Sequence, residues 1–154
     1  MRTLRLFSFL LLALLAACGG MGKDGDPAMI TAANLDQLMD REWLLETITV
    51  DGQRVIMHVD ATQTIRFGSD GRVTGYAGVN RFGGSYTFSP EGLLSWPGAD
   101  LISTRMAGPP ELMEKEQAYL KGLPKTARAI VASSGLQLQS DDGSTVLVFE
   151  QVGK

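Results

Sequence analysis

Residues 54–76, RVIMHVDATQTIRFGSDGRVTGY, decide the fold class of this chain. Two runs in this stretch carry apolar side chains at every second position. The alternating apolar residues are Val55, Met57 and Val59 in the first run and Ile65 and Phe67 in the second. A period of two is typical of strands in a sheet that buries one face. Asp70-Gly71 follows the second run and favours a tight hairpin turn, because both residue types tolerate positive φ. The stretch therefore predicts adjacent antiparallel strands.

The same pattern extends on both sides of this stretch. Asp51-Gly52 and Asp142-Gly143 provide further turn signals between short apolar runs. The predicted strands cover residues 43–50, 54–59, 63–67, 72–76, 84–88, 93–96, 128–132, 136–139 and 146–150. Many short, meandering strands in a small domain predict a mainly β (α+β) fold built on an antiparallel, barrel-like curled sheet.

One segment has a helical period. Residues 111–122 follow two prolines, begin with an acidic residue and end with Lys121 before Pro124, which are helix boundary signals. The residues that fall on one face, which we expect to pack on the sheet, are Leu112, Tyr119, Leu120 and Leu123. A second, short helix is predicted over residues 35–41, with Asn34 as its N-cap and Gln37 reaching back.

The composition excludes several kinds of chemistry. The chain has 154 residues, a formal charge of −3, one Cys and one His, His58. These numbers rule out an intrachain disulfide, a zinc knuckle and a pair of metal-binding histidines. We expect no cofactor, no metal and no nucleic acid partner, because the charge gives no attraction for a phosphate backbone.

Residues 1–17 have the layout of a bacterial export signal. Arg2 and Arg5 precede an almost wholly apolar run, which is shorter than the about 20 residues of a membrane-spanning helix. The run ends in Leu15-Ala16-Ala17-Cys18, which resembles the lipobox of bacterial lipoproteins. That resemblance implies cleavage before Cys18 and attachment of acyl chains to it. Two or more acyl chains anchor a protein stably, so we expect a membrane-anchored protein.

The sequence after the signal suggests the organisation of the anchored protein. Removal of residues 1–17 takes away two Arg and no acidic residue, so the formal charge falls from −3 to −5. Residues 18–33 begin with a Gly-rich stretch and are predicted to be a flexible tether. Residues 34–154 form the predicted domain. Since Gly19 follows the Cys where Asp would favour retention at the inner membrane, the expected location is the periplasmic face of the outer membrane.

Several motifs carry a family resemblance. They are GYAGVNRFGGSY at 75–86, STRMAGP at 103–109 and MEKEQAYL at 113–120, with WLL at 43–45 and LQL at 136–138. Over residues 40–150 the chain resembles the META domain family, which includes the heat-shock protein HslJ. The family motif positions are Gly78, Asn80, Arg81, Gly84, Tyr86, Thr104, Arg105, Met106 and Glu116. The resemblance implies a small antiparallel barrel-like sheet with a helix, and an association with heat shock and envelope stress.

The chain departs from the family pattern at two positions. Val79 and Gly108 stand where the family commonly has cysteines. Both are absent together, as expected if they form a pair in other members, and no thiol-based redox or metal role transfers to this chain.

Polar residues in the motifs are candidates for a site. Glu116 occupies an otherwise apolar helix face, so we expect Arg105 or the Thr104 hydroxyl to approach it in a structural clamp. Asn80 suits a left-handed backbone position, and Tyr86 is expected to close a sheet corner with its ring inward. The glycines at 78–84 lack the Lys of a phosphate-binding loop, which favours a barrel corner over a nucleotide site.

Three classes of function remain open from the sequence. The leading hypothesis is a non-catalytic envelope lipoprotein that contacts other envelope components, including a protein partner. The alternative is binding of a small molecule or lipid in a cavity inside the curled sheet. A hydrolase is the least favoured, because nothing places Ser, Asp and His58 in a nucleophile arrangement, and His58 is expected at the surface or rim.

Overall fold

The computed structural model describes residues 27–56, 62–98, 101–133 and 135–152. The predicted signal peptide, Cys18, His58 and the end of the strand expected at 54–59 lie outside the described residues.

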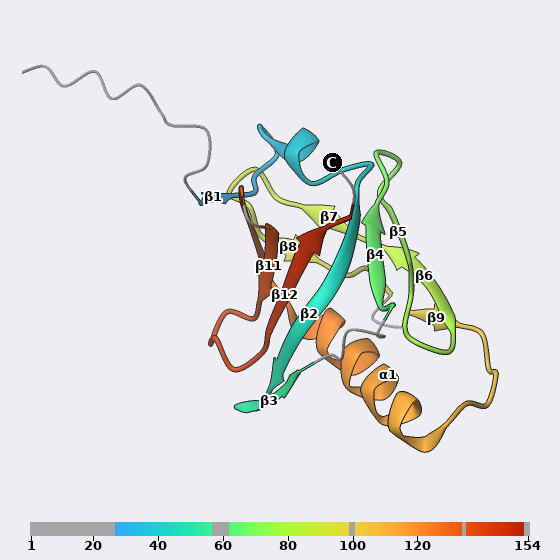
Figure 1. Ribbon diagram of the computed structural model, residues 1–154. Coiled ribbons are helices and arrows are strands. Elements are labelled where there is room, and N and C mark those ends of the chain that lie inside the picture. Colours follow the sequence, from blue (N-terminus) through green and yellow to red (C-terminus); the bar gives the residue numbers. More distant parts are fainter. Residues whose placement is uncertain (1–26, 57–61, 99–100, 134, 153–154) are drawn as a thin grey trace, which may run out of the picture.

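The described chain forms a ten-stranded antiparallel sheet, a two-stranded sheet and one α-helix (Figure 1). Along the large sheet the order is β1-β10-β11-β12-β2-β4-β5-β6-β9, and β3 pairs with β2 beside this path. The strands are β1 (Ala28–Met29), β2 (Glu42–Val50), β3 (Gln53–Ile56), β4 (Thr64–Phe67), β5 (Arg72–Tyr76), β6 (Arg81–Ser85), β7 (Thr87–Phe88), β8 (Leu94–Ser95), β9 (Ile102–Ser103), β10 (Arg128–Ala132), β11 (Gly135–Gln139) and β12 (Val146–Gln151). The mainly β, antiparallel fold class predicted from the sequence is confirmed.

Hairpins join most neighbouring strands, as the turn signals predict. Asp51 and Gly52 both have positive φ, 51° and 78°, and connect β2 to β3. Gly71 at φ 76° and Gly143 at φ 71° serve the β4–β5 and β11–β12 connections. The long-range pairing of β12 with β2 then brings the two ends of the domain together.

The strand predicted at 84–88 was wrong. Strand β6 starts earlier, at Arg81, and residues 87–88 form β7, which pairs only with β8 in the small sheet. Between the two strands the backbone N–H of Tyr86 turns to donate to the Gly71 carbonyl at 2.9 Å. Because glycine is depleted in strands, the low strand propensity of this glycine-rich stretch did not indicate β6. Pairing with β5 and β9 stabilises the strand.

The N-terminal expectations also need correction. The predicted helix at 35–41 is only a 3-10 turn, η1 (Leu35–Gln37), and the Asn34 side chain accepts from the Thr31 N–H at 2.7 Å rather than capping the helix. The domain begins before residue 34, because Ala28 and Met29 pair with β10 and Ile30 is fully buried. A tether reaching to residue 33 is therefore too long.

The helix predicted at 111–122 is confirmed as α1 (Pro110–Gly122), followed by η2 (Leu123–Lys125). Pro110 occupies the first helical turn, where a missing N–H costs nothing. Glu116, Tyr119 and Gly122 are its buried residues, spaced three apart on one face. Figure 1 shows α1 lying across the lower end of the curled sheet.

Aromatic rings fill the interior beneath the helix and sheet. Tyr119 of α1 meets Phe82 of β6 edge to face, with ring centroids 5.6 Å apart, and approaches Phe149 of β12 at 6.3 Å. Phe67 and Tyr86 form a second edge-to-face pair at 5.0 Å. These contacts join β4 and β6, on one side of β2, to β12 on its other side through one core.

Candidate functional site

The Glu116 side chain is buried and accepts three hydrogen bonds. Its Oε2 accepts from the backbone N–H groups of Val79 at 3.0 Å and Asn80 at 2.7 Å, and its Oε1 accepts from Asn80 Nδ2 at 2.7 Å. Helix α1 thus holds the loop between β5 and β6 by a side chain whose described partners are all donors.

Asn80 connects this helix contact to the segment after β9. Its Oδ1 accepts from Thr104 Oγ1 at 2.8 Å and from the Met106 N–H at 2.7 Å, while its Nδ2 also donates to the Met106 carbonyl at 3.1 Å. The Asn80 side chain is only 2% exposed. All four hydrogen-bonding positions of the amide plane are used, which fixes its orientation.

The expected partners of Glu116 were wrong. Arg105 is exposed, and the Thr104 hydroxyl reaches Asn80 instead of Glu116, while also accepting from the Arg81 N–H at 3.2 Å. Two backbone N–H groups and an amide surround the acidic side chain where a guanidinium was expected. Sequence spacing could not show this, because Asn80 and Glu116 are 36 positions apart.

Asn80 is also not left-handed, contrary to expectation. In the described residues the only non-glycine positions with positive φ are Asp40 and Asp51. Gly78 carries the unusual conformation instead, at φ 117°, and a Cβ there would lie 3.1 Å from Gln63 Nε2. Gln63 is fully buried with no hydrogen-bond partner for its amide atoms among the described residues, and no sequence signal pointed to it.

Val79 and Gly108 lie in direct contact across this network. A Cβ built on Gly108 would lie 2.5 Å from Val79 Cγ2 and 3.3 Å from Val79 Cβ. Only glycine fits opposite Val79, because the valine side chain occupies the space that a side chain at position 108 would need. The two positions that depart from the family pattern are therefore spatial neighbours.

The remaining motif residues have separate places. Tyr86 turns its ring inward, as predicted, and its hydroxyl donates to the Gly68 carbonyl at 2.6 Å. Gly84 lies under Leu101, whose Cδ2 would be 2.8 Å from an added Cβ. The Met106 side chain is 56% exposed, so only its backbone belongs to the network.

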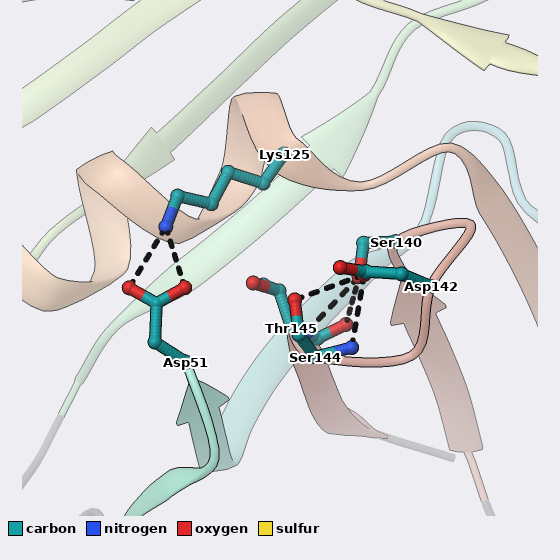
Figure 2. Close-up of polar contacts among 6 residues, drawn as sticks. All are labelled: Asp51, Lys125, Ser140, Asp142, Ser144 and Thr145. Carbon is teal, nitrogen blue, oxygen red and sulfur yellow. Dashed lines mark hydrogen bonds and ion pairs between the residues drawn. The ribbon is translucent and has the colours of Figure 1, made fainter.

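A second polar cluster lies at the β11–β12 turn, away from these motifs (Figure 2). Asp142 Oδ1 accepts from Ser140 Oγ at 2.6 Å, from Ser144 Oγ at 2.9 Å and from the Ser144 N–H at 3.0 Å. The Ser140 hydroxyl is the largest cause that lowers the Asp142 pKa to about 2, followed by Ser144. Nearby, Lys125 pairs with the exposed Asp51 at 3.1 Å. These bonds hold turns, and the lowered pKa makes the Asp142 carboxylate a poor base for either serine.

The described residues contain no cluster of three or more His, Cys, Asp or Glu that could hold a metal ion. Nor does any helix in the described part have the length and apolar character to cross a membrane. The polar side-chain atoms of Asn80 and Glu116 are hydrogen-bonded to other segments of the same chain. The arrangement therefore holds loops in place.

The family assignment comes from comparison with known proteins. The META domain family matches residues 36–153. The chain belongs to this family. The network of Asn80, Thr104 and Glu116 is thus built from motif positions of a META domain.

Solved structures support the META domain fold. A protein from Burkholderia xenovorans, solved by NMR, is 29% identical to this chain and has a TM-score of 0.63. The match covers 79% of this chain and 88% of that protein. A second NMR structure is 26% identical, with coverage of 75% and 92% and a TM-score of 0.54. A DUF4847 family protein from Bacteroides vulgatus, 12% identical over 75% of this chain and 95% of its own, shares the fold at a TM-score of 0.52. No curated protein gives a significant match.

Proposed function

We propose that this protein is a lipoprotein of the bacterial cell envelope, anchored through Cys18 at the periplasmic face of the outer membrane. Its META domain binds other envelope components, including a protein partner, and catalyses no reaction. The observation that carries the proposal is Leu15-Ala16-Ala17-Cys18 at the end of a short export signal. The META family resemblance adds a role under heat shock or envelope stress.

The geometry of the motif residues supports a binding module over an enzyme. Glu116 is enclosed by donors of its own chain, and no second acidic side chain stands beside it among its described partners. General acid and base catalysis needs a group within reach of a substrate, commonly with a second group in the complementary role. A structural clamp fits these contacts better.

Binding of a lipid inside the sheet receives no support from the described core. Rings of Phe67, Phe82, Tyr119 and Phe149 occupy the interior and contact one another or Tyr86. The hollows at β4–β6 and β9 are lined mostly by residues of the sheet's outer face. The domain is therefore better suited to bind partners on its surface.

The anchor is tested by expressing the full-length protein and its Cys18→Ser variant in a Gram-negative host. We expect the unchanged protein in the outer-membrane fraction, with a mass equal to residues 18–154 plus acyl chains. The variant is expected to lose the acyl mass and the membrane association. Recovery of the unchanged protein as a soluble, unacylated chain would contradict the proposal.

Partner binding needs a separate measurement. Crosslinking in intact cells, followed by mass spectrometry, is expected to recover a specific envelope component from the unchanged protein. Loss of that component from the Cys18→Ser sample would show that recognition depends on the anchor. An acylated, folded protein that crosslinks to nothing above background would argue against the interaction role.

A further inference from the structure

The part of the sheet that runs from β2 to β9 carries a continuous row of outward-facing residues. Glu42, Arg66, Thr74, Gly83 and Ile102 are successive cross-strand partners on β2, β4, β5, β6 and β9. Directly paired residues point to the same face of a sheet. Since Ile65 and Phe67 on either side of Arg66 are buried, the row lies on the outer face.

Two hollows follow this row. The larger, about 460 Å³, has at its walls Glu42, Thr64, Arg66, Thr74, Tyr76 and Arg81, and we call it the outer groove. The smaller, about 320 Å³, includes Arg72, Gly83 and Ile102 and shares Thr74 with the outer groove. Because Gly83 has no side chain, nothing rises from that position to divide them. Both hollows are open to solvent along the sheet.

Positive charge gathers on this face although the chain is acidic overall. Arg66, Arg72 and Arg81 line the two hollows, whereas the formal charge of the whole chain is −3. Arg66 reaches Asp40 at 3.5 Å, but both side chains are more than half exposed, so this pair is weak. In the described part of the chain, neither Arg72 nor Arg81 makes a salt bridge. Among the described residues no acidic side chain pairs with their guanidinium groups, which can therefore pair with an anion from outside.

The other groups in the outer groove narrow the chemistry of the ligand. Thr64 and Thr74 offer hydroxyls, and Glu42 offers acceptors that suit hydroxyl groups. Tyr76, the cross-strand partner of Arg81, offers an aromatic face. An acidic peptide brings carboxylates for the arginines but no row of hydroxyl groups, so it would leave Glu42 facing like charge without a donor. Acidic sugars combine carboxylates with hydroxyls and an apolar ring face, which matches all three features.

We propose that the outer groove binds an acidic oligosaccharide. Its carboxylates pair with Arg66 and Arg81, because guanidinium groups match carboxylates in geometry and charge. A sugar ring lies against Tyr76, and sugar hydroxyls donate to Glu42. The proposal names a ligand for the proposed envelope-binding function. It rests on that function only because the cell envelope is where the protein would meet such a glycan.

The test uses the isotope-labelled full-length protein in detergent micelles and a trimer of galacturonic acid as the probe. Backbone NMR shifts are expected to change at β4, β5 and β6, with saturable binding. Arg66→Gln and Arg81→Gln are each expected to weaken binding about tenfold or more, since each removes a charge-assisted hydrogen bond. The matched control is Arg54→Gln, which makes the same change on exposed β3 and is expected to bind as the unchanged protein does.

Two further probes separate the occupants. A neutral trimer of galactose is expected to bind at least about tenfold more weakly, because it lacks the carboxylates. A glutamate tripeptide that binds as tightly as the acidic sugar would overturn the glycan proposal in favour of a peptide. No shift change at about 10 mM probe, or equal loss in Arg54→Gln, would overturn the site itself. These results are independent of the Cys18→Ser experiment, so failure of the groove and failure of the anchor are distinguishable.

Discussion

Asn80 is the residue at which three separate segments of the chain meet. Its backbone and side chain bind Glu116 on α1, and its side chain also binds Thr104 and Met106 after β9. A buried polar network of this kind stabilises only when every member has partners. The motif residues therefore act on stability first, and their effects can be measured one side chain at a time.

Glu116→Gln tests the acceptor role of this side chain. Three N–H groups surround the two Glu116 oxygens, so an amide NH₂ must face at least one donor. We expect the free energy of unfolding in urea to fall by about 2–3 kcal/mol. Glu114→Gln, at an exposed position on the same helix, is the control and is expected to change it little. Equal stability of the two variants would show that the network does not depend on Glu116.

The contact between Val79 and Gly108 predicts that cysteines substituted at both positions form a disulfide. Cβ atoms at these positions lie 3.3 Å apart, close to the about 3.5–4.5 Å of a disulfide. The double variant Val79→Cys/Gly108→Cys, made with Cys18→Ser, is expected to oxidise and to gain roughly 3–4 kcal/mol over its reduced form in urea unfolding. Free thiols that persist under oxidising conditions would contradict this geometry.

At the scale of elements, the position of α1 depends on a close approach at its last turn. A Cβ on Gly122 would lie 3.0 Å from Ile48 Cδ1 and 3.4 Å from Val50 Cγ2, both on β2. Tyr119, one turn earlier, donates from its hydroxyl to the Thr64 carbonyl of β4 at 3.2 Å, and its full burial raises its pKa well above 10.0. The helix is thus fixed on the sheet by one small residue and one large one.

Gly122→Val tests this packing. The added side chain crowds Ile48 and Val50, which must shift to admit it, so thermal or urea unfolding should show a loss of about 1–3 kcal/mol. Gln117→Val is the control, because it places the same side chain on the exposed face of α1. A similar loss in both variants would indicate a helix-propensity effect rather than a packing effect.

At the scale of the whole molecule, the domain is held by pairings between its two ends. Strand β12 pairs with β2 over Thr49 to Trp43, with a register shift at Val148/Phe149. Strand β1 pairs with β10, and the Ile30 N–H donates to the Ala129 carbonyl at 2.8 Å. Residues that the sequence pattern assigned to a tether therefore contribute to the core.

Truncation measures this contribution. A chain starting at residue 34 lacks β1 and the fully buried Ile30, and should lose about 2–5 kcal/mol relative to one starting at residue 27. Urea unfolding of the two chains is the measurement. Equal midpoints and slopes would show that β1 adds nothing to stability.

The sequence predicted the elements whose signals are local. Alternation marked β4 and the described part of the strand at β3, Asp-Gly pairs marked three turns, and the prolines with Lys121 bounded α1. It missed the glycine-rich start of β6 and the two-residue strands β1 and β9, because their order comes from neighbouring strands. In the candidate site, the motif residues were found but their partners were not.

By itself, the sequence determined the mainly β class, the helix at α1 and the family, since side-chain period, turn chemistry and motif spacing are properties of short stretches. Only the tertiary structure decided which side chains meet. Glu116 finds Asn80 across 36 positions, Val79 rests on Gly108, and Arg66 and Arg81 share a groove because strands from distant segments lie side by side. Register and helix docking set these distances, and both depend on burying the whole core at once.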